Sequence, residues 1–110
     1  MTSRVQMLVT ISGISELMIE IHTNIDIPFI YEKGFNRPFR PIGVMWDALP
    51  DIGQVIVERM FQIDGVIAVQ FSPYCITIHR ARLFSSEVIL GDITQGMQDI
   101  FKEVLDITCE

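Results

Sequence analysis

The 110-residue sequence contains little of the chemistry that marks the common catalytic and metal-binding classes of protein. Its two cysteines, Cys75 and Cys109, are too few for a disulfide framework. It has no CxxC or HExxH motif, no GxSxG nucleophile turn and no glycine-rich phosphate loop. We therefore expect no catalytic residue, no metal ligand and no cofactor.

Positive charge and long apolar runs are also scarce. Eight Lys and Arg residues stand against fourteen Asp and Glu, so the net charge is −6. A chain this acidic does not attract phosphate backbones, and nucleic acid is not an expected partner. No apolar run approaches the ~20 residues of a membrane helix, and the first residues lack the apolar segment of a secretory signal. We expect a cytoplasmic protein with reduced thiols and no membrane contact.

The sequence does hold enough apolar material for one well-packed domain that covers residues 1–110. Hydrophobic residues make up 49% of the chain, which is typical of a globular protein and not of a disordered one. A domain of this length buries roughly two thirds of the surface that its unfolded chain exposes. Such burial supports a core without disulfides or metal.

Alternating apolar and polar residues predict two β-hairpins. In the first, the strands VQMLVTIS and SELMIEIHT are separated by a break at Gly13. In the second, VIAVQF and CITIH are joined by the turn SPY, which contains Pro73. We expect Phe71 and Ile78 of the second hairpin to be buried.

Two further stretches predict helices, because their apolar residues recur at helical spacing. The first helix begins near Pro50 and ends before Gly65, and the second covers about residues 87–105. Their apolar stripes are Ile52, Val55, Ile56 and Met60 in the first and Val88, Ile93, Met97, Ile100, Phe101 and Val104 in the second. With the hairpins, this order predicts an α+β fold: an antiparallel or mixed sheet of four to five strands, with two helices packed on one face.

Residues 24–47 form a proline-rich segment that cannot be one continuous helix. We expect an ordered loop, with IPFIY as a short edge strand. Its aromatic rings either cover one end of the core or form a partner or dimer surface, where aromatics and Arg are enriched. The candidate partner-binding residues are Phe35, Arg37, Phe39, Arg40 and Trp46. We favour a homodimer over a monomer, with this loop or an open sheet edge at the interface.

Cys75 and His79 are the nearest pair of potential metal ligands along the chain. They share one face of a predicted strand, but four residues at ~3.3 Å each place their Cα atoms about 13 Å apart. His22 would become a third ligand only if its strand lay alongside. Arg80 points to the opposite face and does not activate the thiol. We therefore expect a partly buried thiol, and neither a metal site nor a nucleophile.

The segment RMFQIDGVIAVQFSPYCITIHRA resembles the N-terminal domain of Nfu/NifU-type iron–sulfur scaffold proteins. In that family a helix ends in a Leu-Phe pair. An apolar residue, an acidic residue or Pro, and then Gly-Val follow it. The counterparts here are MF at residues 60–61 and IDGV at residues 63–66. A strand containing Phe follows, as Phe71 does here, and then an Ile-Thr-Val-Thr-Lys type strand, which reads ITIHR at residues 76–80. The later segment ILGDITQGMQDIFKEV is similar to the family's closing helix.

The resemblance implies the fold and a role in protein–protein contact, with iron–sulfur assembly or recipient proteins as partners. The family's cluster-binding CxxC belongs to a separate C-terminal domain that this chain lacks, so the resemblance transfers no cluster ligand. We expect a non-catalytic protein-interaction module. The alternative is a small enzyme or anion-binding protein, with a pocket under residues 24–47 where Arg37 or Arg40 would hold the anion.

Overall fold

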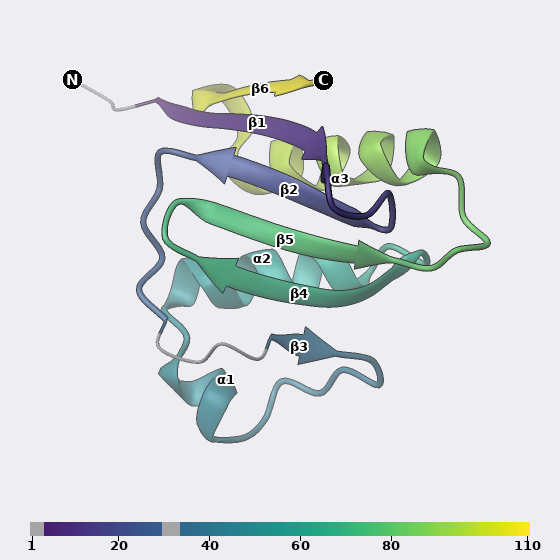
Figure 1. The fold of residues 1–110 in the computed structure, drawn as a ribbon. Helices are drawn as coiled ribbons and strands as arrows, with labels where there is room; N and C mark the ends of the chain where they lie inside the picture. The colour runs from purple at the N-terminus through teal and green to yellow at the C-terminus, as the bar shows by residue number, and fades with distance from the viewer. Residues whose placement is uncertain (1–3, 30–33) are drawn as a thin grey trace.

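The computed structural model describes residues 4–29 and 34–110 and shows a six-stranded sheet with helices behind it (Figure 1). The elements in chain order are β1 (Val5–Ile11), β2 (Met18–Thr23), β3 (Phe35–Asn36), α1 (Val44–Ala48), α2 (Asp51–Phe61), β4 (Val66–Ser72), β5 (Cys75–Arg80), α3 (Ser86–Phe101), the 3-10 turn η1 (Lys102–Val104) and β6 (Leu105–Cys109).

The sheet is mixed, and its strand order is β3-β4-β5-β2-β1-β6. The pairs β1·β2 and β4·β5 are the two predicted hairpins, and β2 joins them by pairing antiparallel with β5. Strand β6 instead runs parallel to β1, since it returns to the sheet after α3. The predicted α+β class, with a mixed sheet built on two hairpins, is confirmed.

The core lies between the sheet and the two longer helices, α2 and α3, which Figure 1 shows on the same side of the strands. Phe71 and Ile78 are buried there, as predicted. The two helices approach each other closely at Gly96, where a Cβ atom would lie 2.9 Å from Met60 Cε. The largest fully buried side chains are Ile19, Ile21, Ile56, Met60, Ile76, Ile78, Ile89, Ile93, Met97, Val9, Val57 and Val66.

The C-terminal segment differs from the sequence prediction. Helix α3 ends at Phe101 and not near residue 105, because Lys102 adopts a positive φ of 56° that a continuing helix cannot accommodate. Residues beyond η1 then form β6, so Cys109 belongs to a strand. Together with the two-residue β3, this strand brings the sheet to six strands instead of four to five.

Both helices present a slightly different face to the core than expected. Val55 and Val88 are exposed, at 47% and 56%, although both were assigned to apolar stripes. Their neighbours Val57 and Ile89 are fully buried. The other residues of both predicted stripes are buried or half-buried. Only Val55 and Val88 are placed wrongly, because several apolar residues adjoin one another and the spacing alone fits more than one face.

Residues 34–48 are ordered and packed against the edge of the sheet, as the sequence predicted for the loop. Strand β3 pairs with β4, and the short helix α1 follows beside it (Figure 1). The expected edge strand at residues 27–31 is not formed by residues 27–29, and its remainder, with Tyr31, lies outside the described residues. No helix among the described residues is both long and apolar enough to cross a membrane.

Candidate functional site

The sheet has a second face that the described helices leave uncovered. Residues alternate along each strand, so polar side chains lie opposite the buried Ile and Val residues. On β2 and β5 this alternation places Glu20, His22, Cys75, Thr77 and His79 on the side away from α2 and α3. Figure 1 shows the strands in front of both helices, with this face toward the viewer. It is therefore the accessible side of the sheet.

Three potential metal ligands converge on this face. The antiparallel register of β2 and β5 places His22 directly opposite Cys75, and Glu20 lies two residues before His22 on the same side of β2. His22 Nε2 is 3.2 Å from Glu20 Oε2. One ligand atom from each of the three residues lies within 4.8 Å of the other two. From the sequence, His22 would become a third ligand only if its strand lay beside that of Cys75. The pairing of β2 with β5 meets this condition.

His79, the potential ligand nearest to Cys75 along the chain, is not part of this cluster. Its ring Nε2 lies 3.0 Å from Gln70 Oε1 on the neighbouring strand β4. Sequence reasoning missed Glu20 as a member of the cluster. The signal that could have found it is the shared alternation of Glu20 and His22, combined with pairing of β2 and β5.

The pKa of the Cys75 thiol is raised from its ordinary value, chiefly by burial and next by the negative charge of Glu20. Hydrogen bonds from Thr77, Ser72 and the backbone of Ile21 offset part of this increase. A thiol with a raised pKa is protonated at neutral pH and is a poor nucleophile. The local electrostatics of the metal-free protein therefore favour a passive, protonated thiol over a catalytic one.

Arg80 lies on the other face of the sheet from Cys75, as predicted, and is buried. Its Nε donates to the carbonyl of Glu16 at 3.0 Å and its Nη1 to the carbonyl of Phe84 at 2.8 Å. These bonds join the β1–β2 turn to the segment before α3. The guanidinium thus has a structural role and supplies no positive charge to the thiol.

An open hollow of about 540 Å³ adjoins the cluster on the uncovered face. Its walls come from β1, the end of β2 and β6, and His22 belongs both to the hollow and to the cluster. The lining residues are Gln6, Met7, Leu8, His22, Thr23, Asn24, Asp106 and Thr108.

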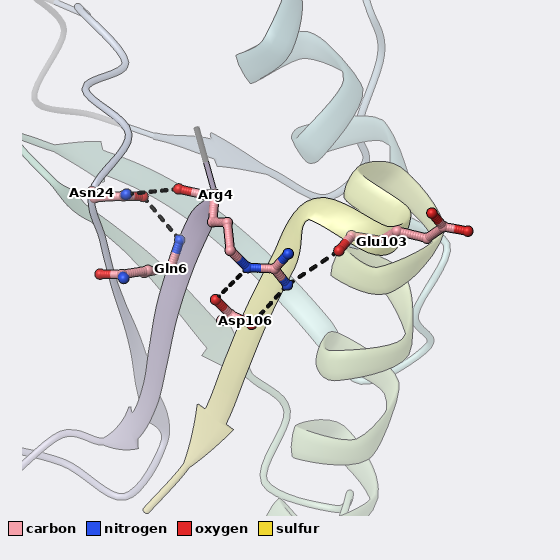
Figure 2. Close-up of polar contacts among 5 residues, drawn as sticks. All are labelled: Arg4, Gln6, Asn24, Glu103 and Asp106. Carbon is pink, nitrogen blue, oxygen red and sulfur yellow. Dashed lines mark hydrogen bonds and ion pairs between the residues drawn. The ribbon is translucent and has the colours of Figure 1, made fainter. Parts of the chain in front are cut away.

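Hydrogen bonds hold the strands around this hollow in place (Figure 2). The Asn24 side chain accepts from the backbone N–H of Gln6 at 2.9 Å and donates to the carbonyl of Arg4 at 3.0 Å. The Arg4 guanidinium donates to both carboxylate oxygens of Asp106, at 2.7 and 2.8 Å, and to the carbonyl of Glu103 at 3.1 Å. The start of β1 is thereby tied to the end of β2 on one side and to β6 on the other.

The aromatic residues predicted to bind a partner are turned toward the core. Phe35 and Trp46 are buried, and their rings meet edge to face with centroids 5.8 Å apart. Phe39 is half-buried and stacks on Phe61 at 4.7 Å. The structure therefore supports the interpretation in which these rings cover one end of the core. A partner role for the portions that remain accessible stays a prediction.

The two predicted arginines of this region differ in their environment. Arg37 donates from Nε to the carbonyl of Val66 at 2.6 Å and from Nη2 to those of Phe61 and Ile63 at 2.7 and 2.9 Å. Its guanidinium also lies 5.4 Å from the centroid of the Phe61 ring. Arg40 is exposed. Arg37 therefore fastens the loop to the end of α2 and the start of β4.

A hollow of about 360 Å³ lies beside the aromatic loop, residues 34–48. The anion-binding alternative predicts a pocket in this region. Three of the donor contacts of Arg37 are already made to backbone carbonyls, and Glu58 brings a carboxylate to the same lining. Arg40 does not line it. Because a carboxylate repels an anion, this geometry favours anion binding less than the sequence suggested. The lining residues are Arg37, Phe39, Pro41, Glu58, Phe61 and Gln62.

No family model, curated protein or solved structure matches this chain. The resemblance to the Nfu/NifU-type domain stays a prediction.

Proposed function

We propose that the chain is a non-catalytic protein-interaction module that docks a protein partner on the uncovered face of its sheet. The observation that carries this proposal is a six-stranded sheet with both long helices on one side and an open hollow of about 540 Å³ on the other. An accessory role in iron–sulfur cluster assembly or delivery is proposed from the sequence resemblance of residues 59–81 alone.

The charge of the chain indicates the chemistry of the partner. The net charge is −6, and the Arg4 guanidinium on this face is already paired with Asp106 at 2.7 Å. Glu20 adds a second carboxylate, with His22 as its neighbour. Complementary charge steers association and selects partners, so the contacting surface of the partner is expected to be basic. Binding should weaken as the salt concentration rises.

The chemistry of the face supports a binding role over catalysis. Cys75 has a raised pKa, and the adjoining hollow is open to solvent. Enzyme pockets commonly bury most of their ligand, which an open hollow does not do. A surface of this kind suits a protein segment laid across several strands.

The test is affinity capture from the native cell with wild-type protein and two variants that each add one positive charge. Leu8→Arg places the charge in the hollow, and Val55→Arg places it on the exposed outer side of α2. We expect Leu8→Arg to lose the captured partner and Val55→Arg to retain it. Equal capture by both variants would contradict docking on this face. Reproducible capture of only unrelated proteins would contradict the iron–sulfur role while leaving the docking face intact.

The homodimer also stays a proposal. The aromatic loop is folded inward, which leaves the outer edge of β6 as the candidate interface, because an edge strand presents unpaired backbone groups. Sedimentation velocity of wild-type protein at high concentration should show a dimer. A monomer under those conditions would remove this proposal without affecting the docking face.

A further inference from the structure

We propose that Glu20, His22 and Cys75 form a binding site for one zinc-class transition-metal ion on the uncovered face of the sheet. The proposal goes beyond the docking role and does not depend on it. Thiolate sulfur, imidazole nitrogen and carboxylate oxygen are the three donor types that zinc takes from proteins. The cluster supplies one of each.

The distances within the cluster fit one shared ion. A tetrahedral ion at ~2.0–2.3 Å from each ligand atom holds those atoms about 3.2–3.8 Å apart. The 3.2 Å between His22 Nε2 and Glu20 Oε2 already has this length. The remaining separations are at most 4.8 Å, so they close by about 1 Å through side-chain torsions. His22 is exposed and the other two residues are half-buried, which leaves room for that adjustment.

The backbone beneath the cluster is paired with neighbouring strands on both sides. Strands β2 and β5 lie in the interior of the sheet, each paired on both sides. Functional groups on such elements are held more precisely than groups on loops. The hydroxyls of Ser72 and Thr77 also hydrogen-bond with the Cys75 side chain. Partners of this kind orient a ligand and raise metal affinity.

The mixed donor set selects the class of ion. Magnesium and calcium prefer sites made of oxygen ligands, whereas copper(I) prefers sites dominated by sulfur. One thiolate, one imidazole and one carboxylate suit Zn²⁺, with the fourth coordination position on the solvent side filled by water. Binding removes the thiol proton of Cys75, since the thiolate is the form that ligates metal.

The chain provides a matched control for two of the ligands. His79 lies on the same face as the cluster but is bonded to Gln70. Cys109 is the second thiol, and its Sγ lies 3.3 Å from Thr94 Oγ1 of α3, behind the sheet. Neither side chain belongs to the proposed site. His79→Gln and Cys109→Ser therefore remove the same functional groups as the ligand variants without touching the ion.

The experiment titrates reduced, metal-free protein with Zn²⁺ by calorimetry and with Co²⁺ by absorption spectroscopy. Wild-type protein should bind a single ion per chain and show thiolate-to-cobalt charge-transfer absorption. Cys75→Ser should abolish that absorption. His22→Ala and Glu20→Gln should each weaken zinc binding by at least the roughly 10- to 100-fold that loss of an outer-shell partner causes. His79→Gln and Cys109→Ser should leave the affinity unchanged.

Several results would overturn the site. These are the absence of saturable zinc binding in the wild type, charge-transfer absorption that survives Cys75→Ser, and equal loss of binding in Cys109→Ser. Circular dichroism checks that each variant is folded. Cadmium NMR of the wild-type protein gives a readout that needs no variant: one sulfur ligand with nitrogen and oxygen supports the site, and oxygen ligands alone contradict it.

Discussion

The aromatic loop at residues 34–48 and the uncovered face of the sheet both carry residue types that are common at binding sites, but the fold uses them in opposite ways. In the loop, Phe35 and Trp46 are buried and Arg37 is bonded to backbone carbonyls. On the face, Glu20, His22 and Cys75 stay at least partly accessible and converge. The first set stabilises the domain, and the second is free to contact a ligand.

The reason for this difference is the position of the helices. Aromatic rings gain free energy by leaving water, so a loop rich in them folds onto the nearest apolar surface. Here that surface is the end of the core around Phe61. The polar side of β2 and β5 has no apolar side chains of that size to bury. Accessibility, and not residue type, therefore separates the candidate site from the scaffold.

The largest expected effect is the loss of stability from Phe61→Ala. Phe61 is buried, stacks on Phe39 at 4.7 Å and lies under the Arg37 guanidinium. Truncation of such a ring costs about 3–5 kcal/mol in free energy of unfolding, which urea denaturation measures. The matched change on the uncovered face, Thr108→Ala, should alter the free energy of unfolding by only about 0.5 kcal/mol. Similar losses in both variants would break the division between the two regions.

A smaller loss of stability is expected from Arg37→Met, which keeps an apolar stem but removes the three donor contacts to carbonyls. Hydrogen bonds from a charged donor each contribute about 1.5–3 kcal/mol when buried. Because Arg37 is exposed, we expect a smaller total, near 1–3 kcal/mol, by urea denaturation. The control is Arg40→Met at an exposed position. A neutral Arg37→Met that lost partner binding would restore the loop as an interaction surface.

Much of the fold was predictable because it depends on local alternation. Ile19 and Ile21 of β2, and Ile76 and Ile78 of β5, recur at every second residue and are all buried. Strand β6 was missed because its short alternating segment directly follows the apolar stripe of α3. The 3-10 turn η1, which begins at Lys102 with its positive φ, separates the two elements, and sequence spacing carries no signal for it.

The candidate site was less predictable, since it depends on how two hairpins pair. The strand spacing of ~3.3 Å per residue separates Cys75 from His79, and the register places His22 beside Cys75 instead. The sequence predicts no metal site and allows His22 as a third ligand only if its strand lies alongside that of Cys75. The sequence of either hairpin alone does not predict that β2 and β5 are neighbours. Their pairing forms only when both hairpins bury their apolar faces under the same helices.

A subtler prediction concerns the reactivity of Cys75. The negative charge of Glu20 contributes to the raised pKa of the thiol, after burial. Glu20→Gln removes that charge, so the pKa should fall and the thiolate fraction at neutral pH should rise. Alkylation at Cys75, followed by mass spectrometry in metal-free protein, should therefore become faster, with Cys109 as internal reference. Unchanged or slower alkylation would show that Glu20 does not act on the thiol.

The smallest expected effect is on the pH dependence of the β6 edge. The hydrogen bond from Arg4, followed by its charge, lowers the pKa of Asp106 below the ordinary value of 3.8. A carboxyl group whose pKa is depressed by folding adds stability above its unfolded pKa and loses it as the pH falls through the folded value. Both side chains are exposed, so the effect is local and weak.

Acid should therefore loosen the uncovered face before it affects the aromatic loop. As the pH falls below about 4, amide protection in β6, corrected for intrinsic exchange rates, should decrease in the wild type. In Asp106→Asn the amide protection of β6 should be lower at neutral pH and should not change with acid in this range. The Arg59–Asp99 ion pair should respond to acid in the same way in both proteins. The stack of Phe39 on Phe61 contains no titrating group, so protection of β3 should persist. Identical β6 profiles in the wild type and the variant would show that the Arg4–Asp106 pair does not hold this edge of the hollow.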